Sequence, residues 1–313
     1  MSLPERDGTM PQATAPRQRL AGEPFDAPVA PTRAALDSRA CTPDHPAHME
    51  KRYRNDRLVT LGLLLAFTLV VHLVFTLVVR PSADSWLEEQ KAAFAKDPGR
   101  QPERSFWVII KDPEQEVAII LALWALALAG MKVRNIGRER RQLDSQPLRV
   151  ATGFRILPGD VREHSRSLEN LPPESRELIP ARTIRRALKR FGETTNVQHA
   201  ATTVHDFCES EAARLDSELA PIRFCVWAIP AIGFVGTVRG IGHALQGAQL
   251  ALRGDTSAVT AGLGVSFNST FVALILSIVL MYVVHELQLA QERLVLDTEA
   301  YVDDAVLSNL QSR

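Results

Sequence analysis

The chain has 313 residues, with 36 basic and 36 acidic side chains, and its mean hydropathy is −0.04. A net charge of zero excludes a whole-chain electrostatic role in binding nucleic acid or an anionic membrane surface. The three cysteines form no CxxC pair, so the sequence supports neither a disulfide framework nor a zinc knuckle. These averages are typical of a soluble protein, but the apolar residues are collected into four uncharged runs.

The N-terminal part contains a polar segment followed by the first of these runs. Residues 1–50 are rich in proline and poor in large apolar side chains, so they cannot bury enough surface to offset chain entropy. We predict a disordered cytoplasmic segment there. Residues 58–79 are apolar and uncharged, and at about 1.5 Å per residue they are long enough to cross the hydrocarbon core. This run starts too far into the chain for a cleaved signal peptide, so it is predicted to be transmembrane helix 1.

The second run is shorter and its flanks carry charge. Residues 80–116 mix acidic and basic side chains and are predicted to be a periplasmic connection. Residues 117–133 are predicted to be transmembrane helix 2, with Glu116 and Lys132 snorkelling toward the interfaces to extend its reach. No acidic residue occurs inside any of the four runs, so we expect the chain to lack a carboxylate of its own within the membrane.

The C-terminal half alternates between polar and apolar segments. Residues 134–221 are predicted to be cytoplasmic and mostly helical, loop-like at first and helical from about residue 181. Transmembrane helix 3 (222–245), a periplasmic loop (246–260) and transmembrane helix 4 (261–284) follow, and 285–313 form a cytoplasmic helix. Basic clusters at 51–57 and 132–141 place both termini in the cytoplasm by the positive-inside rule. The fold class is therefore an all-α integral membrane protein with four transmembrane helices and cytoplasmic helical extensions.

Small residues line one face of each of the last two transmembrane helices. At helical spacing they make close-packing surfaces that include hydroxyl groups. They either serve helix packing alone or line a narrow wet path, and spacing does not choose between the two. The residues assigned to packing or to a kink are Pro230, Gly233, Gly236, Gly240 and Gly262.

Two threonines on these faces stand at similar depth. Thr237 and Thr270 lie roughly 10 and 14 Å from the outer ends of their helices, near the middle of the membrane. Ser266, Asn268 and Ser269 add polar groups that need a partner or water there. We expect Arg239 to snorkel toward the outer surface. His72 in helix 1 has either a structural, hydrogen-bonded role or a functional one.

The segments 230–241 (PAIGFVGTVRGI) and 261–283 (AGLGVSFNSTFVALILSIVLMYV) resemble the MotA/TolQ/ExbB proton channel family. They are similar to the TolQ and ExbB patterns LGLLGTVxGM and GIxEALxxTxxGL, and the four-helix layout is similar to MotA. Where ExbB has a glutamate, this chain has Val265. The matching positions are Gly236, Thr237, Val238 and Gly240 in the first pattern, and Gly262, Leu263 and Thr270 in the second.

The resemblance implies a function and partners. It implies an ion-conducting, stator-type subunit in the bacterial inner membrane, with Thr237 and Thr270 along the path of a proton. It also implies a ring of five copies around a single-span MotB/TolR/ExbD-like partner, whose membrane aspartate supplies the carboxylate. Independently of the resemblance, the sequence has no P-loop, HExxH or GxSxG motif, so we expect neither enzymatic activity nor a cofactor.

Two other classes of function remain open from the sequence. An oligomeric membrane scaffold would use the same small-residue faces for packing only. A small-solute transporter is less favoured, because the sequence has neither inverted repeats nor broken helices beyond Pro230.

Overall fold

The computed structural model describes residues 46–96, 105–148 and 155–311. The chain divides into two compact units, Met1–Arg52 and Tyr53–Arg313, and the polar contacts between the helices lie in the second. Most of the segment predicted to be disordered, residues 1–45, lies outside the described residues.

Four long helical stretches are long and apolar enough to cross a membrane among the described residues: Leu58–Ala93, Pro113–Asp144, Val197–Gln246 and Ser257–Asn309. Each contains one of the four apolar runs, but extends beyond it. The first stretch is built from α1 (Pro46–Val74), a five-residue π-helical segment η3 (Phe75–Val79) and α2 (Arg80–Lys96). Part of the predicted periplasmic connection is therefore helical.

The other long stretches also depart from the predicted bounds. After α3 (Phe106–Ile110), α4 (Pro113–Asp144) begins with Asp112 as its N-cap residue and carries acidic residues in its first turn, where the helix dipole favours negative charge. The third stretch is α8 (Val197–Ser217) followed by α9 (Ala220–Gln246), with only two residues between them. After α10 (Ala248–Ala251), α11 (Ser257–Ala305) contains the fourth run and the larger part of the predicted tail helix (285–313) in one uninterrupted helix.

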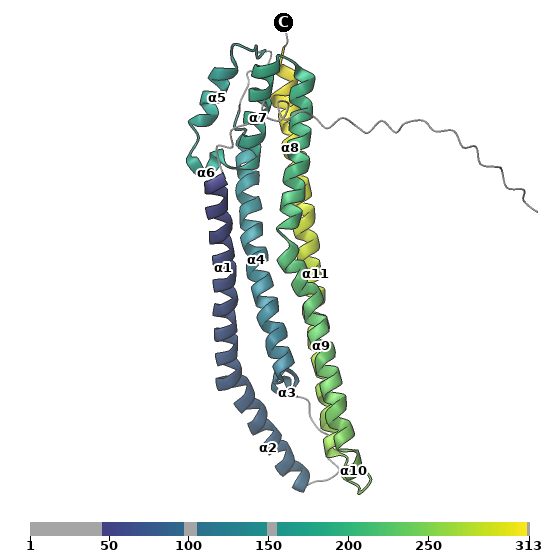
Figure 1. The fold of residues 1–313 in the computed structure, drawn as a ribbon. Coiled ribbons are helices and arrows are strands. Elements are labelled where there is room, and N and C mark those ends of the chain that lie inside the picture. The colour runs from purple at the N-terminus through teal and green to yellow at the C-terminus, as the bar shows by residue number, and fades with distance from the viewer. Residues whose placement is uncertain (1–45, 97–104, 149–154, 312–313) are drawn as a thin grey trace, which may run out of the picture. The chain divides into compact units, whose positions relative to one another are not determined.

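Helices α4, α9 and α11 lie side by side and bury the membrane-level core (Figure 1). Alanines and leucines of α4 pack there against apolar residues of α9 and α11, including Ile229 and Leu280, which are 0% and 1% exposed. The end of α1 and the segment η3 pack on α4 through a smaller cluster around Phe75, and the Trp124 indole donates a hydrogen bond to the carbonyl of Thr60 (3.0 Å). Large apolar residues on the outward faces of α1, α9 and α11 stay exposed, as expected for a chain solvated by lipid.

Shorter helices form a second core beside the ends of α8 and α11. They are α5 (Val161–Glu169), α7 (Ile179–Thr194) and the 3₁₀ turn η4 (Leu307–Asn309), and their core includes the fully buried Phe191; the short helix α6 (Pro173–Arg176) lies between α5 and α7 in the chain and has no buried residue. The segment 168–180, predicted to be loop-like, contains the four-residue helix α6, which is too short to give a periodic signal. Among the described residues the only extended pairing is an isolated bridge between Ile156 and Leu310.

Candidate functional site

Helices α9 and α11 approach closely because glycines stand where side chains would collide. A Cβ atom on Gly240 would lie 2.6 Å from the carbonyl oxygen of Gly262, and one on Gly262 would lie 2.5 Å from the backbone nitrogen of Ala244. A Cβ atom on Gly233 would lie 2.7 Å from the Cβ of Ala273. The two backbones can reach this separation only with glycine at these positions.

Pro230 interrupts the hydrogen bonding of α9, and α11 compensates. A proline has no N–H, so the carbonyl four residues earlier, that of Val226, loses its helical partner. The Ser277 hydroxyl donates to this carbonyl oxygen at 2.9 Å. Ser277 is 5% exposed, so water does not reach this contact. The Ser277 hydroxyl therefore takes the place of the missing helical donor.

Four of the predicted polar residues meet at the α9–α11 contact. We call them the hydroxyl cluster: Thr237, Ser266, Ser269 and Thr270. The Thr237 and Thr270 hydroxyls are hydrogen-bonded to each other. The Ser266 hydroxyl donates to the carbonyl of Thr237 (3.0 Å), and Ser269 reaches the carbonyl of Ser266 (3.1 Å). Asn268 takes part in none of these bonds and is partly exposed, so the structure does not bring it into the cluster.

The Thr237–Thr270 pair has two equivalent hydrogen-bond arrangements. Both hydroxyl oxygens lie near the carbonyl of Gly233, at 3.2 Å for Thr237 and 3.3 Å for Thr270. Each hydroxyl has one hydrogen, so one threonine donates to this carbonyl while the other donates to its neighbour, and the two roles can exchange. A hydroxyl pair of this kind can accept a proton on one oxygen and release one from the other.

A charged side chain reaches the same contact from α4. Glu114 and Arg239 form a two-point ion pair, with Nη2 to Oε2 at 2.7 Å and Nε to Oε1 at 2.6 Å. Asp112 lies 3.4 Å from the same guanidinium. Burial raises the pKa of the Asp112 carboxyl, although the positive charges of Arg239 and Lys111 oppose the shift.

The next carboxylate along α4 is paired with the first long helical stretch. Glu116 Oε1 lies 2.6 Å from His72 Nδ1, and Glu116 Oε2 accepts from Arg80 Nη2 at 2.7 Å. The segment η3 explains why both partners reach one carboxylate. In a regular helix His72 and Arg80 would point about 80° apart, and the one extra residue of a π segment reduces this to about 20°.

We call these six residues the charged layer: His72, Arg80, Asp112, Glu114, Glu116 and Arg239. Glu116 and Arg239, both expected to snorkel toward an interface, form buried or half-buried ion pairs. The chain also carries carboxylates of its own at the start of a spanning helix. A search for apolar segments misses these carboxylates, because each predicted span ends at the first charged residue. The basic side chains that neutralise the carboxylates lie on other helices, which the local sequence does not show.

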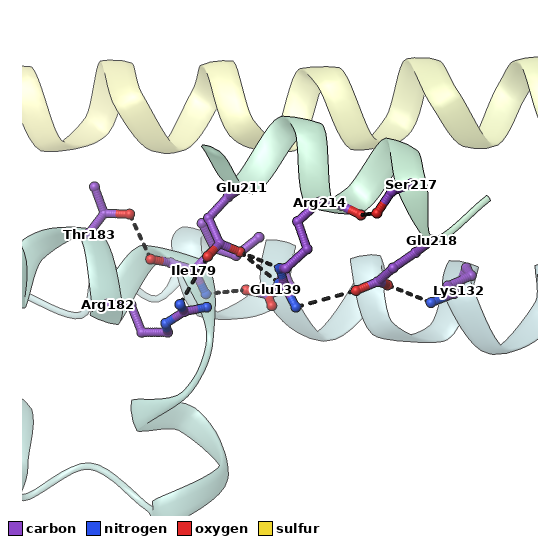
Figure 2. Close-up of polar contacts among 9 residues, drawn as sticks. All are labelled: Lys132, Glu139, Ile179, Arg182, Thr183, Glu211, Arg214, Ser217 and Glu218. Carbon is purple, nitrogen blue, oxygen red and sulfur yellow. Dashed lines mark hydrogen bonds and ion pairs between the residues drawn. The ribbon is translucent and has the colours of Figure 1, made fainter. Parts of the chain in front are cut away.

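A second set of charges joins α4, α7 and α8, close to the junction of α8 with α9 (Figure 2). Glu211, whose side chain is 4% exposed, lies between Arg182 (2.9 Å) and Arg214 (2.7 Å). Glu218 links Arg214 to Lys132 of α4. Glu139 of α4 accepts the N–H of Ile179 at 2.8 Å, at the first residue of α7. This charge network fixes the junction to α4. It is made of Lys132, Glu139, Arg182, Glu211, Arg214 and Glu218.

Clustered metal ligands and cysteines are the remaining reactive groups to locate in the described part of the chain. No group of three or more histidine, cysteine, aspartate or glutamate side chains with metal-site geometry occurs in residues 46–96, 105–148 and 155–311. Cys208 and Cys225 are buried free thiols.

The geometry so far defines a class, a multi-pass membrane protein with a polar contact between two closely packed spanning helices. The sequence model of the MotA/TolQ/ExbB proton channel family matches residues 175–300, from α6 into the last part of α11. The match covers less than half of the chain; over this segment the chain is similar to that family, which confirms the resemblance noted in the sequence. No curated protein matches the chain significantly. The chain is thus an all-α membrane protein of the ion-channel type.

Proposed function

We propose that the chain is a proton-conducting, stator-type subunit, and that the proton passes the hydroxyl pair Thr237–Thr270. The observation that carries this proposal is the exchangeable hydrogen-bond arrangement of the pair, held between two helices at glycine-limited separation. Ser266 and Ser269 keep neighbouring carbonyls satisfied, so the pair is free to change donor and acceptor roles.

The energy source in this proposal is the membrane potential. A unit charge that crosses 100 mV releases about 2.3 kcal/mol, enough to bias a rotation or a tilt. A single-span MotB/TolR/ExbD-like partner would contribute a membrane aspartate that receives the proton. In the chain itself, Glu114 is engaged in an ion pair with Arg239, which is consistent with a carboxylate supplied by the partner.

The proposed assembly is a ring of five copies in the bacterial inner membrane, with both termini in the cytoplasm. The exposed apolar faces of α9 and α11 would then contact neighbouring copies, the partner or lipid. The α7–α8 region and the charge network would lie on the cytoplasmic side and transmit motion between the spans and the second core. Native mass spectrometry of the purified complex counts the copies directly, and a number other than five contradicts this part of the proposal.

The test of function is proton flux in liposomes that contain the full chain and its partner. Thr270→Val removes the hydroxyl at nearly constant volume, so flux should collapse. Thr68→Val is the matched control, because Thr68 donates only to the carbonyl of Leu64 on its own helix (2.8 Å). Unchanged flux in Thr270→Val would remove this residue from the path. It would favour the alternative, an oligomeric scaffold in which the hydroxyls serve packing only.

A further inference from the structure

We propose that the basic outer face of α7 in one copy docks on the acidic outer face of α11 in the neighbouring copy, so that adjacent copies are in contact at the second core as well as in the membrane. This inference rests on the ring of the proposed function and deepens it, because it names the two surfaces that meet between copies. The observations that carry it are the opposite charges of the two faces, their exposure and their shared level in the molecule.

Helix α7 presents a strongly basic face. Its 16 residues include five basic side chains and one acidic one. Arg182 is only partly exposed and pairs with Glu211 of α8 at 2.9 Å. Arg185 and Lys189 lie one turn apart on the exposed side of the helix, and neither has an ion-pair partner among the described residues. Their charges are therefore available to an acidic surface outside the chain.

The last part of α11 presents an acidic face. Between Glu292 and Asp304 this helix carries five acidic side chains and one basic one. Two of the acids pair with residues of α4 and α8. The other three, Glu292, Asp303 and Asp304, are exposed and have no ion-pair partner in the part of the chain that the structure describes. The net charge of this face is opposite to that of α7.

Both helices belong to the second core, which fixes the level and the direction of the two faces. Leu188 and Phe191 of α7 and Val295 and Val302 of α11 are buried in this core. The charged side chains leave the opposite sides of the two helices, so they point away from the core and from each other. Within residues 155–311, the ion pairs of α7 lead to α8 or stay on α7, and those of α11 lead to α4 and α8. The two faces thus do not neutralise each other within one copy.

A ring brings such faces together. If its axis runs along the membrane normal, rotation carries one copy to the next at constant depth, so two faces at the same level of the core meet at the same level between copies. A contact between two different faces is head to tail, and it closes into a ring when the rotation does. Opposite charges across the contact select which faces meet and fix their register.

Carbodiimide crosslinking of the full chain with its partner in micelles tests this contact through a native lysine. The reagent joins a lysine amine directly to a carboxylate that it touches, without a spacer. We expect covalent dimers on a denaturing gel, with mass spectrometry showing Lys189 joined to the acidic face of α11. Lys189→Arg keeps the charge but removes the amine, so these dimers should disappear. The ion pair of Lys132 with Glu218, at 2.5 Å within one copy, is the internal control and should crosslink in the monomer band.

A charge reversal tests whether the contact depends on electrostatics. Arg185→Glu keeps Lys189 and all the acids, and it should lower the yield of the dimer several-fold. Arg162→Glu, at an exposed position of α5, is the matched control and should leave the yield unchanged. Thermal unfolding verifies that both variants fold. An unchanged yield in Arg185→Glu would contradict docking by complementary charge.

Native mass spectrometry of the same sample separates this inference from the proposed assembly. If the sample is oligomeric and the control pair crosslinks, but Lys189 forms no link to the acidic face of another copy, the inference is overturned while the ring stands. If the chain is present as a single copy, the proposed ring fails, and the contact between copies fails with it.

Discussion

The bond between Ser277 and the carbonyl of Val226 gives the sharpest test of how the two packed helices are held together. Pro230 removes the helical donor to this carbonyl, and the Ser277 hydroxyl replaces it at 2.9 Å in a buried position. Ser277→Ala should therefore destabilise the chain by about 1 kcal/mol, since hydrogen bonds between membrane helices average about 0.6 and reach about 1.7 kcal/mol. The substitution removes one oxygen and leaves no sizeable cavity, so the loss reports on the bond.

A double-mutant cycle with Pro230→Ala isolates this interaction. Alanine at 230 restores an N–H that can bond to the carbonyl of Val226, so Ser277→Ala should cost much less in that background. The assay is reversible unfolding of the purified chain in detergent micelles, with all four variants compared. Equal costs of Ser277→Ala in the two backgrounds would refute the reasoning, because the serine would then stabilise the contact by something other than the orphaned carbonyl.

Three further predictions use the same unfolding assay. Gly240→Ala should destabilise the chain by about 1–3 kcal/mol, because its Cβ would lie 2.6 Å from two backbone atoms of α11; Gly242→Ala, with open space around it, is the matched control, and equal effects would contradict the close contact. Glu211→Ala should cost about 1–3 kcal/mol, because Arg182 loses its buried carboxylate while the half-exposed Arg214 keeps Glu218; no measurable loss would mean that water already solvates Arg182. Lys132→Ala should cost at most about 1 kcal/mol, because its ion pair with Glu218 is partly exposed; a loss as large as that of Glu211→Ala would contradict this ranking.

The spanning helices and the hydroxyl contact could be predicted from local sequence. An uncharged run long enough for the hydrocarbon core is a one-dimensional signal, and each of the four runs lies within a long helix. Small residues at helical spacing likewise share a face, and the structure packs the faces of Gly233 and Ala273 together. Which functional role these residues have is a separate question that packing does not answer.

The charged layer could not be predicted, for a physical reason. The cost of placing Glu116 or Arg239 at membrane depth depends on whether an opposite charge meets it, and that charge lies on another helix. The His72 and Arg80 side chains lie on the same face only because of the π-helical segment η3, and no residue of the apolar run predicts that segment. The only local signal was an acidic first turn after Pro113, a pattern that also occurs in ordinary helix starts.

The most direct test of conduction through the hydroxyl pair compares two substitutions at one position. Proton flux is measured in liposomes that contain the full chain and its partner, with Thr270→Ser and Thr270→Val side by side. Serine keeps the hydroxyl that bonds to Thr237, whereas valine keeps the shape and loses it. If the proton passes the hydroxyl pair, we expect Thr270→Ser to keep flux close to that of the wild type and Thr270→Val to lose it. Equal flux in the two variants would contradict conduction through the pair.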